Sequence, residues 1–225
     1  MDYITFWEVC LLSIPLYFAM NQDETQKYPA PRRAQLGFGF QINGNTVIPS
    51  RLIPDAPAVV NDMVLPEAAP EVEELAERCV MGCILDFERK ITPVHIAILQ
   101  ELEKRLPKTS ILVIPTALLP YSSIGIPLIC PVNQKNSWKN FCKMQEQAYS
   151  RWFWEVIPWN LTRSFPIKGT SQGVLTEALC CYERNRGSVR YFDTEETIEN
   201  KLRIAETQGC LGAVGLAMEL SQLKK

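Results

Sequence analysis

Histidine and paired cysteines are scarce in this sequence, and their scarcity argues against a metal centre. The 225 residues contain one histidine, and none of the eight cysteines belongs to a C-x-x-C pair. Zinc sites are built mainly from closely spaced Cys and His ligands, so no metal site is expected. The nucleotide-binding loops G-x-G-x-x-G and G-x-x-x-x-G-K-[ST] are also missing. We therefore expect no cofactor.

The chain also lacks a strong excess of charge. It carries 23 basic and 25 acidic residues, for a formal net charge of −2, and the basic residues form no long run. Proteins that bind nucleic acid or anionic membranes usually cluster positive charge on one face. We expect neither partner. The composition leaves the oligomeric state open.

A long uninterrupted apolar segment is missing as well. Residues 4–20 are apolar and aromatic, but Glu8 interrupts them, Pro15 breaks them, and no basic residue precedes them. A membrane-spanning helix needs about 20 apolar residues, and a signal peptide begins with a basic region. We predict a core strand over residues 3–10 and no membrane span. An export signal stays the alternative.

The cysteines are placed as small core residues usually are. Six of them stand in or beside apolar runs, which is common for free, buried thiols; they are Cys79, Cys83, Cys130, Cys180, Cys181 and Cys210. This pattern favours a reducing cytoplasm. The composition, 47% hydrophobic and 21% charged, is that of a globular protein, and we predict a single barrel domain over residues 1–225.

Apolar periodicity predicts strands that alternate with helices or long connections. The predicted strands cover residues 3–10, 36–42, 58–65, 82–88, 110–115, 126–131, 173–182 and 211–218, and the predicted helices cover 66–79, 91–106, 137–156 and 194–207. Strand, helix and strand in succession indicate a parallel sheet. Eight strands favour a (β/α)8 TIM barrel, compact or partly irregular. An open, doubly wound sheet is the alternative.

One short apolar run ends abruptly in two carboxylates. On a strand over residues 82–88, Asp86 and Glu88 point to one face, in line with Ile84. Thr92 and Pro93 then mark a helix start, as N-cap and first helical residue. Parallel α/β proteins usually present their chemistry between a strand end and the following helix. The alternative is a strand end whose acids meet only solvent or an arginine.

Four short segments together resemble glycoside hydrolase family 18. Residues 191–201 (YFDTEETIENK) and 208–214 (QGCLGAV) are similar to the end of the family's barrels, where a Tyr-Asp element, a helix with a lysine and a Gly-Leu-Gly-Gly-Val strand close the barrel. Residues 178–184 (ALCCYER) resemble the strand before it. Residues 82–88 resemble the second half of the D-x-x-D-x-D-x-E signature, which lies on the fourth strand.

The sequence departs from the family at several positions. Met81 and Ile84 stand where the signature has its first two aspartates. Ala217 lies near the position of the family's last-strand tryptophan, and the sixth-strand Met-x-Tyr element has no counterpart. The chain is also short, which leaves little room for the insertion domain that many members carry.

The resemblance implies a mechanism and a set of site residues. Glu88 would act first as general acid and then as base, while Asp86 would orient the substrate's acetamido group, which serves as nucleophile. Tyr182 and Glu219, at the ends of predicted strands, and Tyr121 are the candidates for substrate contacts. The implied partner is a carbohydrate ligand.

Three functions remain open from the sequence. The first is hydrolysis of N-acetylhexosamine-containing glycans through Glu88 and Asp86. The second is a catalytically inactive barrel that binds a glycan or a protein partner, which the residues at Ile84 and Ala217 favour. The third is an unrelated α/β enzyme, such as a carboxylate-using aldolase or lyase. The sequence does not distinguish internal from terminal cleavage.

Overall fold

The structure is a computed structural model that forms two compact units. One unit holds the described residues within Tyr17–Ile129, and the other holds those within Cys10–Leu16 and Cys130–Lys225. The predicted strand 3–10 lies outside the described residues, as does the predicted helix 66–79 apart from the helical Ala76. The structure describes residues 14–20, 26–27, 32–37, 41–43, 46–48, 56–62, 65, 76, 81–131, 137–164 and 169–223.

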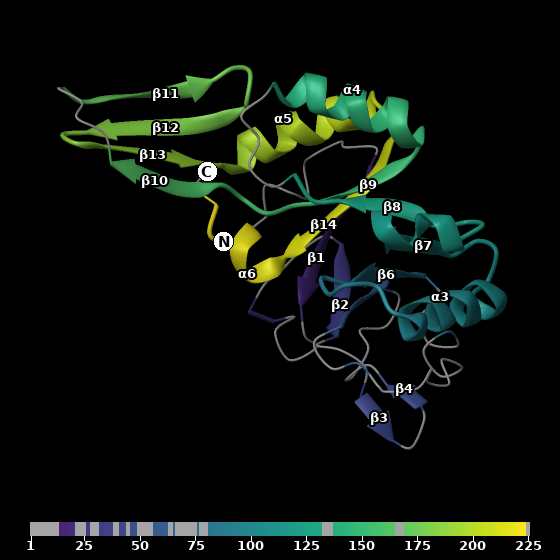
Figure 1. Cartoon of the computed structure of the whole chain (residues 1–225). Helices are drawn as coiled ribbons and strands as arrows, with labels where there is room; N and C mark the ends of the chain where they lie inside the picture. The colour runs from purple at the N-terminus through teal and green to yellow at the C-terminus, as the bar shows by residue number, and fades with distance from the viewer. Residues whose placement is uncertain are drawn as a thin grey trace. The chain divides into compact units, whose positions relative to one another are not determined.

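Eight strands follow the order of a closed barrel, β1-β14-β9-β8-β7-β6-β5-β2. The predicted (β/α)8 barrel class is thereby confirmed, and β6 is the fourth barrel strand along the chain, as expected (Figure 1). The bounds are β1 Leu16–Met20, β2 Arg33–Gly37, β5 Ala58–Asn61, β6 Gly82–Asp86, β7 Ile111–Pro115, β8 Ile126–Ile129, β9 Trp152–Glu155 and β14 Cys210–Leu216.

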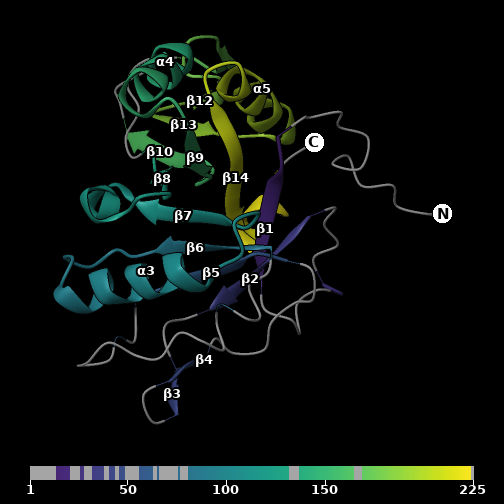
Figure 2. The same cartoon turned by 90° about the vertical axis from the view of Figure 1, so that its right-hand side faces the viewer.

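In the first unit, helix α3 (Pro93–Arg105) covers one face of β6 (Figure 2). The side chains of Cys83, Leu85 and Phe87 share an apolar cluster with the fully buried Ile98, Leu99 and Leu102 of α3. Side chains alternate along a strand, so Ile84 and Asp86 lie on the opposite face, away from α3. This alternation decides which residues of β6 are available for chemistry.

Local sequence explains where β6 and α3 begin. Gly82 has a φ of +137°, and a Cβ there would lie 2.6 Å from the backbone oxygen of Ile111 on β7, so only glycine fits this strand start. Thr92 is the N-cap of α3 and Pro93 is its first residue, as predicted. Pro107 follows the helix end, and the predicted helix 91–106 is confirmed.

The remaining elements of the first unit are short. The predicted strand 36–42 overlaps β2 and also β3 (Gln41–Asn43), while residues 38–40 lie outside the described residues. Strand β3 forms a hairpin with β4 (Thr46–Ile48). Between β7 and β8 the chain forms a 3₁₀ helix, η2 (Thr116–Tyr121). Strand β5 ends at Asn61, earlier than predicted.

In the second unit, the predicted helix over residues 137–156 is wrong in its last third. Helix α4 (Trp138–Tyr149) ends before Ser150, whose φ is +56°, and the barrel strand β9 follows. Trp152, Phe153 and Trp154 are all buried, as expected for a strand covered on both faces. A segment whose residues are apolar on every side has no hydrophobic periodicity, so the sequence gives no signal for the change from helix to strand.

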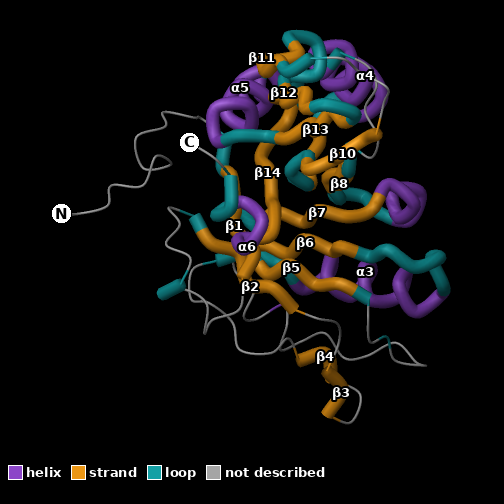
Figure 3. The backbone as a smooth tube through the Cα atoms, turned by 90° about the vertical axis from the view of Figure 1, so that its left-hand side faces the viewer, coloured by secondary structure: helices purple, strands orange, loops and turns teal. Residues whose placement is uncertain are grey.

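The predicted barrel strand over residues 173–182 is also wrong. Two antiparallel strands, β11 (Ser171–Leu175) and β12 (Cys180–Asn185), occupy it, separated by a turn in which Leu179 has a φ of +50°. They join β10 (Asn160–Ser164) and β13 (Ser188–Phe192) in a sheet of order β10-β13-β12-β11 (Figure 3). This insertion sheet stands between β9 and β14 in the chain, contrary to the expected lack of room.

The C-terminal elements follow the sequence signals closely. Helix α5 (Glu195–Glu206) overlaps the predicted helix 194–207 and begins after the N-cap Thr194, whose side chain accepts a hydrogen bond from the Thr197 amide. The buried Lys201 of α5 forms an ion pair with the buried Asp193, with 2.6 Å between Nζ and Oδ1. The indole N–H of Trp138 donates to the backbone oxygen of Lys201, which ties α4 to α5. A short helix, α6 (Ala217–Leu220), follows β14.

Candidate functional site

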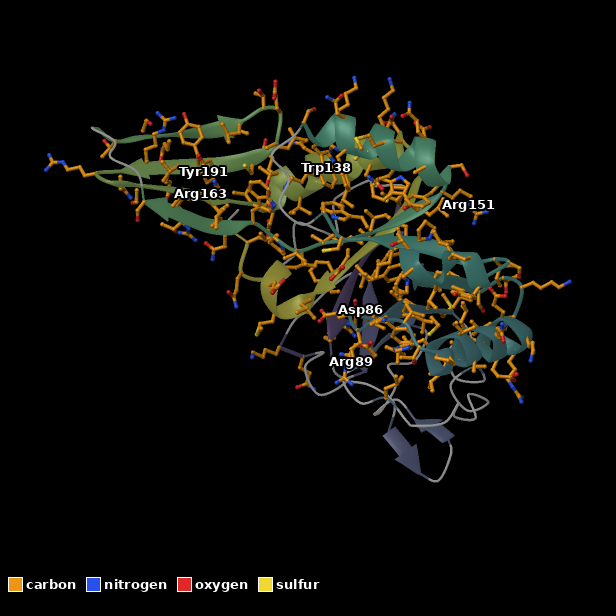
Figure 4. The ribbon with its side chains drawn as sticks, in the orientation of Figure 1. Asp86, Arg89, Trp138, Arg151, Arg163 and Tyr191 are labelled. Atoms are coloured by element: carbon orange, nitrogen blue, oxygen red, sulfur yellow. The ribbon has the colours of Figure 1, made fainter. Side chains whose placement is uncertain are left out.

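The candidate site lies where β6 ends and the chain turns toward α3. Asp86, the last residue of β6, is half-buried, and Glu88 is exposed (Figure 4 labels Asp86 and the nearby Arg89). Phe87, between them, is buried on the α3 side of the strand. Because side chains alternate along a strand, Asp86 lies on the face of β6 away from the helix, and Glu88 follows two residues later, beyond the end of the strand.

A buried carboxylate that the sequence reasoning missed anchors this loop. Asp62 follows β5, is 3% exposed, and lies beside the loop because Asn61 pairs in register with Asp86. Its Oδ1 accepts a hydrogen bond from the Glu88 amide at 3.2 Å, and its Oδ2 accepts one from the Arg89 amide at 3.0 Å. Asp62 therefore fixes the backbone that carries the Glu88 side chain.

The chain's single histidine completes the anchor. His95 of α3 is fully buried; its Nε2 lies 3.2 Å from Asp62 Oδ2 and its Nδ1 lies 3.0 Å from the Thr92 amide nitrogen. An amide N–H can only donate, so Nδ1 accepts and Nε2 carries the hydrogen that is donated to Asp62. The ring also packs against Phe87, with 4.8 Å between ring centroids.

Neither anchor residue had a clear signal in the sequence. Asp62 and Glu88 are separated by 26 positions, and Asp62 and His95 by 33. A lone histidine in the first turn of an amphipathic helix indicates nothing about its partner. The one available hint is that Asp62 directly follows a barrel strand, where polar residues of α/β barrels tend to be functional.

The structure shows what surrounds the residues that depart from the family signature. Ile84 is fully buried and pairs in register with Val59 on one side and Val113 on the other, so an apolar side chain occupies the place of the signature's inner aspartate. Met81 is 51% exposed, just before β6. Ala217 is buried at the start of α6. Asp86 therefore has no carboxylate neighbour at position 84 of its own strand.

Tyr121 lies in the same unit as Asp86 and Glu88. It is the last residue of η2, which follows β7, the strand next to β6, and it is 49% exposed. It lines a surface hollow of about 670 Å³ together with Gln100 and Lys104 of α3. Neither Asp86 nor Glu88 lines that hollow. A role for Tyr121 in substrate binding stays a prediction.

Tyr182 and Glu219 lie in the second unit. Tyr182 is within β12 of the insertion sheet, so the expectation that it ends a barrel strand is wrong. Glu219 belongs to α6, directly after β14, and burial raises the pKa of its half-buried carboxyl group. Their roles in substrate binding stay predictions.

Within the part of the chain that the structure describes, no group of three or more His, Cys, Asp or Glu side chains is arranged to hold a metal ion. No helix in that part is long and apolar enough to cross a membrane. Of the described cysteines, all six are free thiols, and Cys83, Cys180 and Cys210 are buried as predicted.

Comparisons with known proteins identify the fold. No protein-family model and no curated protein matches the sequence. The spore cortex-lytic enzyme SleL of Bacillus cereus superposes with a TM-score of 0.57 at 10% identity, covering 92% of this chain and 73% of its own. A GH18 chitinase from Cycas revoluta, in complex with (GlcNAc)3, superposes with a TM-score of 0.54 at 9% identity, covering 91% and 95%. SleL of Bacillus megaterium gives 0.54 at 10% identity, covering 92% and 72%.

These structures agree with the resemblance noted in the sequence. At such low identity the likeness concerns the fold, because one barrel fold supports many activities. The chain has the fold of a divergent GH18-like barrel.

Proposed function

We propose that this protein is a glycoside hydrolase that acts on N-acetylhexosamine-containing glycans, with Glu88 as its acid/base residue. The observation that carries the proposal is the placement of Glu88. Its carboxylate is exposed just after the fourth barrel strand, while the buried Asp62 anchors its backbone amide. The Cycas chitinase of the same fold, which holds (GlcNAc)3 in its structure, supports the choice of ligand.

The proposed reaction uses two carboxylates in different roles. Glu88 donates its proton to the glycosidic oxygen as the bond from that oxygen to C1 breaks. The carbonyl oxygen of the substrate's acetamido group forms the new bond to C1, and Asp86 accepts a hydrogen bond from the acetamide N–H to orient it. Water then attacks C1 and gives a proton to Glu88, which restores the acid and the acetamido group.

Release of a fluorophore from an aryl chitobioside tests the proposal. Purified protein should release it, and Glu88→Gln should lower kcat by about 10²- to 10⁴-fold, the usual contribution of a general acid. Glu146→Gln removes another exposed carboxylate, from α4, and should leave the rate unchanged. Equal rates for the two variants would refute the role of Glu88.

A second candidate function is glycan binding without turnover. Ile84 favours it, because the fully buried isoleucine removes the carboxylate that the family signature places beside Asp86. In that case no N-acetylated substrate would be cleaved, yet calorimetry would detect a chito-oligosaccharide bound by the protein. Absence of both turnover and binding would exclude both functions.

A further inference from the structure

One face of the insertion sheet combines aromatic and basic side chains. The strand register places Leu161, Tyr191, Tyr182 and Gly173 in one row across the sheet and Arg163, Val189, Arg184 and Ser171 in another row. The two rows are two residues apart on every strand, so they share a face. Figure 4 labels two members from neighbouring strands, Arg163 and Tyr191. We call the four residues Arg163, Tyr182, Arg184 and Tyr191 the Tyr–Arg face.

The ring of Tyr182 covers a glycine on the neighbouring strand. A Cβ built on Gly173 would lie 3.1 Å from Cε1 and from the hydroxyl oxygen of Tyr182, so the ring occupies the space that a side chain would take. The guanidinium carbon of Arg184 lies 5.4 Å from the centre of the same ring. A half-buried aromatic ring therefore stands beside a cation on the surface of the sheet.

The charge of the insertion sheet contrasts with that of the chain. Residues 160–192 contain five basic and two acidic residues, a formal charge of +3 in a chain of net −2, which leaves −5 for the rest. On the other face, Arg190 pairs in register with Glu183. On the Tyr–Arg face, Arg163 and Arg184 are exposed, and among the described residues neither takes part in an ion pair.

We propose that the Tyr–Arg face binds a glycan that carries carboxylates. The planar guanidinium groups of Arg163 and Arg184 match a carboxylate through paired hydrogen bonds. The rings of Tyr182 and Tyr191 offer flat apolar surface with a polar hydroxyl edge, which suits the apolar face of a sugar ring. The choice of a glycan rests on the proposed function, and the preference for an acidic one rests on the local charge.

Two hexasaccharides of equal length test this preference. Calorimetry would compare hyaluronan hexasaccharide, in which N-acetylglucosamine alternates with a uronic acid, with neutral chitohexaose, using the full-length Glu88→Gln variant to prevent cleavage. We expect hyaluronan to bind roughly tenfold more tightly at low salt, since charge-assisted hydrogen bonds are about twice as strong as neutral ones. The preference should shrink at 0.5 M salt, because exposed charges are screened.

A double variant locates the binding. Arg163→Gln with Arg184→Gln should abolish the preference for hyaluronan. Lys139→Gln with Lys143→Gln removes the same charge from two exposed positions of α4 in the same unit and should preserve it. Tyr182→Phe should retain binding, whereas Tyr191→Ala should weaken both ligands by roughly fivefold or more, the loss expected for a buried aromatic contact.

The outcomes separate this inference from the proposed function. If the wild type releases the fluorophore but shows no preference for hyaluronan, the proposal for the Tyr–Arg face is overturned and the proposed hydrolysis stands. A preference that disappears only in the arginine variant would support the face even if no substrate is cleaved. Equal effects of the arginine and lysine variants, or tighter binding of a single-stranded hexanucleotide than of hyaluronan, would overturn it.

Discussion

Replacing His95 with phenylalanine tests the anchor beneath Glu88. Phenylalanine keeps an aromatic ring of similar size against Phe87, so packing changes little. It removes both ring nitrogens, and with them the hydrogen bond donated to Asp62 and the one accepted from the Thr92 amide. Asp62, 3% exposed, then has only the two amide donors from Glu88 and Arg89.

The structure sets the size of the effect. A hydrogen bond to a charged group contributes about 1.5–3 kcal/mol, and a buried donor left without an acceptor costs about 1–3 kcal/mol. His95 is fully buried, so water does not replace either bond. Part of the loss is recovered by relaxation of the loop, and we expect the anchor to weaken by about 2–3 kcal/mol.

Hydrogen exchange of the amides of Glu88 and Arg89 is the direct readout, because both donate to Asp62. A loss of about 2 kcal/mol corresponds to roughly 30-fold faster exchange at these two positions. The control is Glu101→Gln on the exposed side of α3, which removes a surface ion pair with Lys104 and should change exchange less than about twofold.

The anchoring of the Glu88 loop by Asp62 and His95 also predicts an effect on activity. If Asp62 and His95 position Glu88, then His95→Phe should lower kcat on the aryl chitobioside while KM changes little. Asp62→Asn should also lower kcat. The asparagine side chain would replace one acceptor oxygen with an NH₂ donor, which would face the donors of Glu88, Arg89 or His95. Unchanged exchange at Glu88 and Arg89 in His95→Phe would falsify the anchor, whatever happens to activity.

Three further predictions concern stability and reactivity. Gly82→Ala should destabilise the protein by more than about 2 kcal/mol, because its positive φ and the crowding at β7 both oppose a side chain; Gly187→Ala, at positive φ but in open space, is the control in a urea titration. Lys201→Met should cost about 3–5 kcal/mol by leaving Asp193 buried without its cation, seen as a lower melting temperature. Burial raises the pKa of Cys210 to about 12, so its thiol should resist iodoacetamide at pH 8 until the protein unfolds, as mapped by mass spectrometry.

Elements with strong local signals were predictable from the sequence. Thr92 and Pro93 mark the start of α3, and Thr194 marks the start of α5; both helices follow with a regular apolar period. Strand β6 was visible because a short apolar run follows a glycine and ends in charge. In each case the information lies within a few residues, which is the range over which propensity and capping act.

The elements that were mispredicted depend on contacts outside their own segment. Strand β9 is a strand because β14 pairs with it, placing Trp152 opposite Cys210 and Trp154 opposite Ala213. Its aromatic residues continue the apolar character of α4 without a change of period. In the same way, only the turn at Leu179 divides β11 from β12, and leucine is a poor signal for positive φ.

The residues of the candidate site likewise divide into a pair that the local sequence showed and a pair that depends on distant contacts. Asp86 and Glu88 were visible as a pair on one strand, while Asp62 and His95 reach the loop only through the pairing of β5 with β6 and the packing of α3. Asp62 contacts the backbone amide of Glu88, and among the described residues no hydrogen bond of the Glu88 side chain is seen. Glu88→Gln therefore leaves the anchor intact, so any loss of turnover in that variant belongs to the carboxylate itself. If instead Asp62→Asn lost turnover and Glu88→Gln did not, the loop would have a structural role alone.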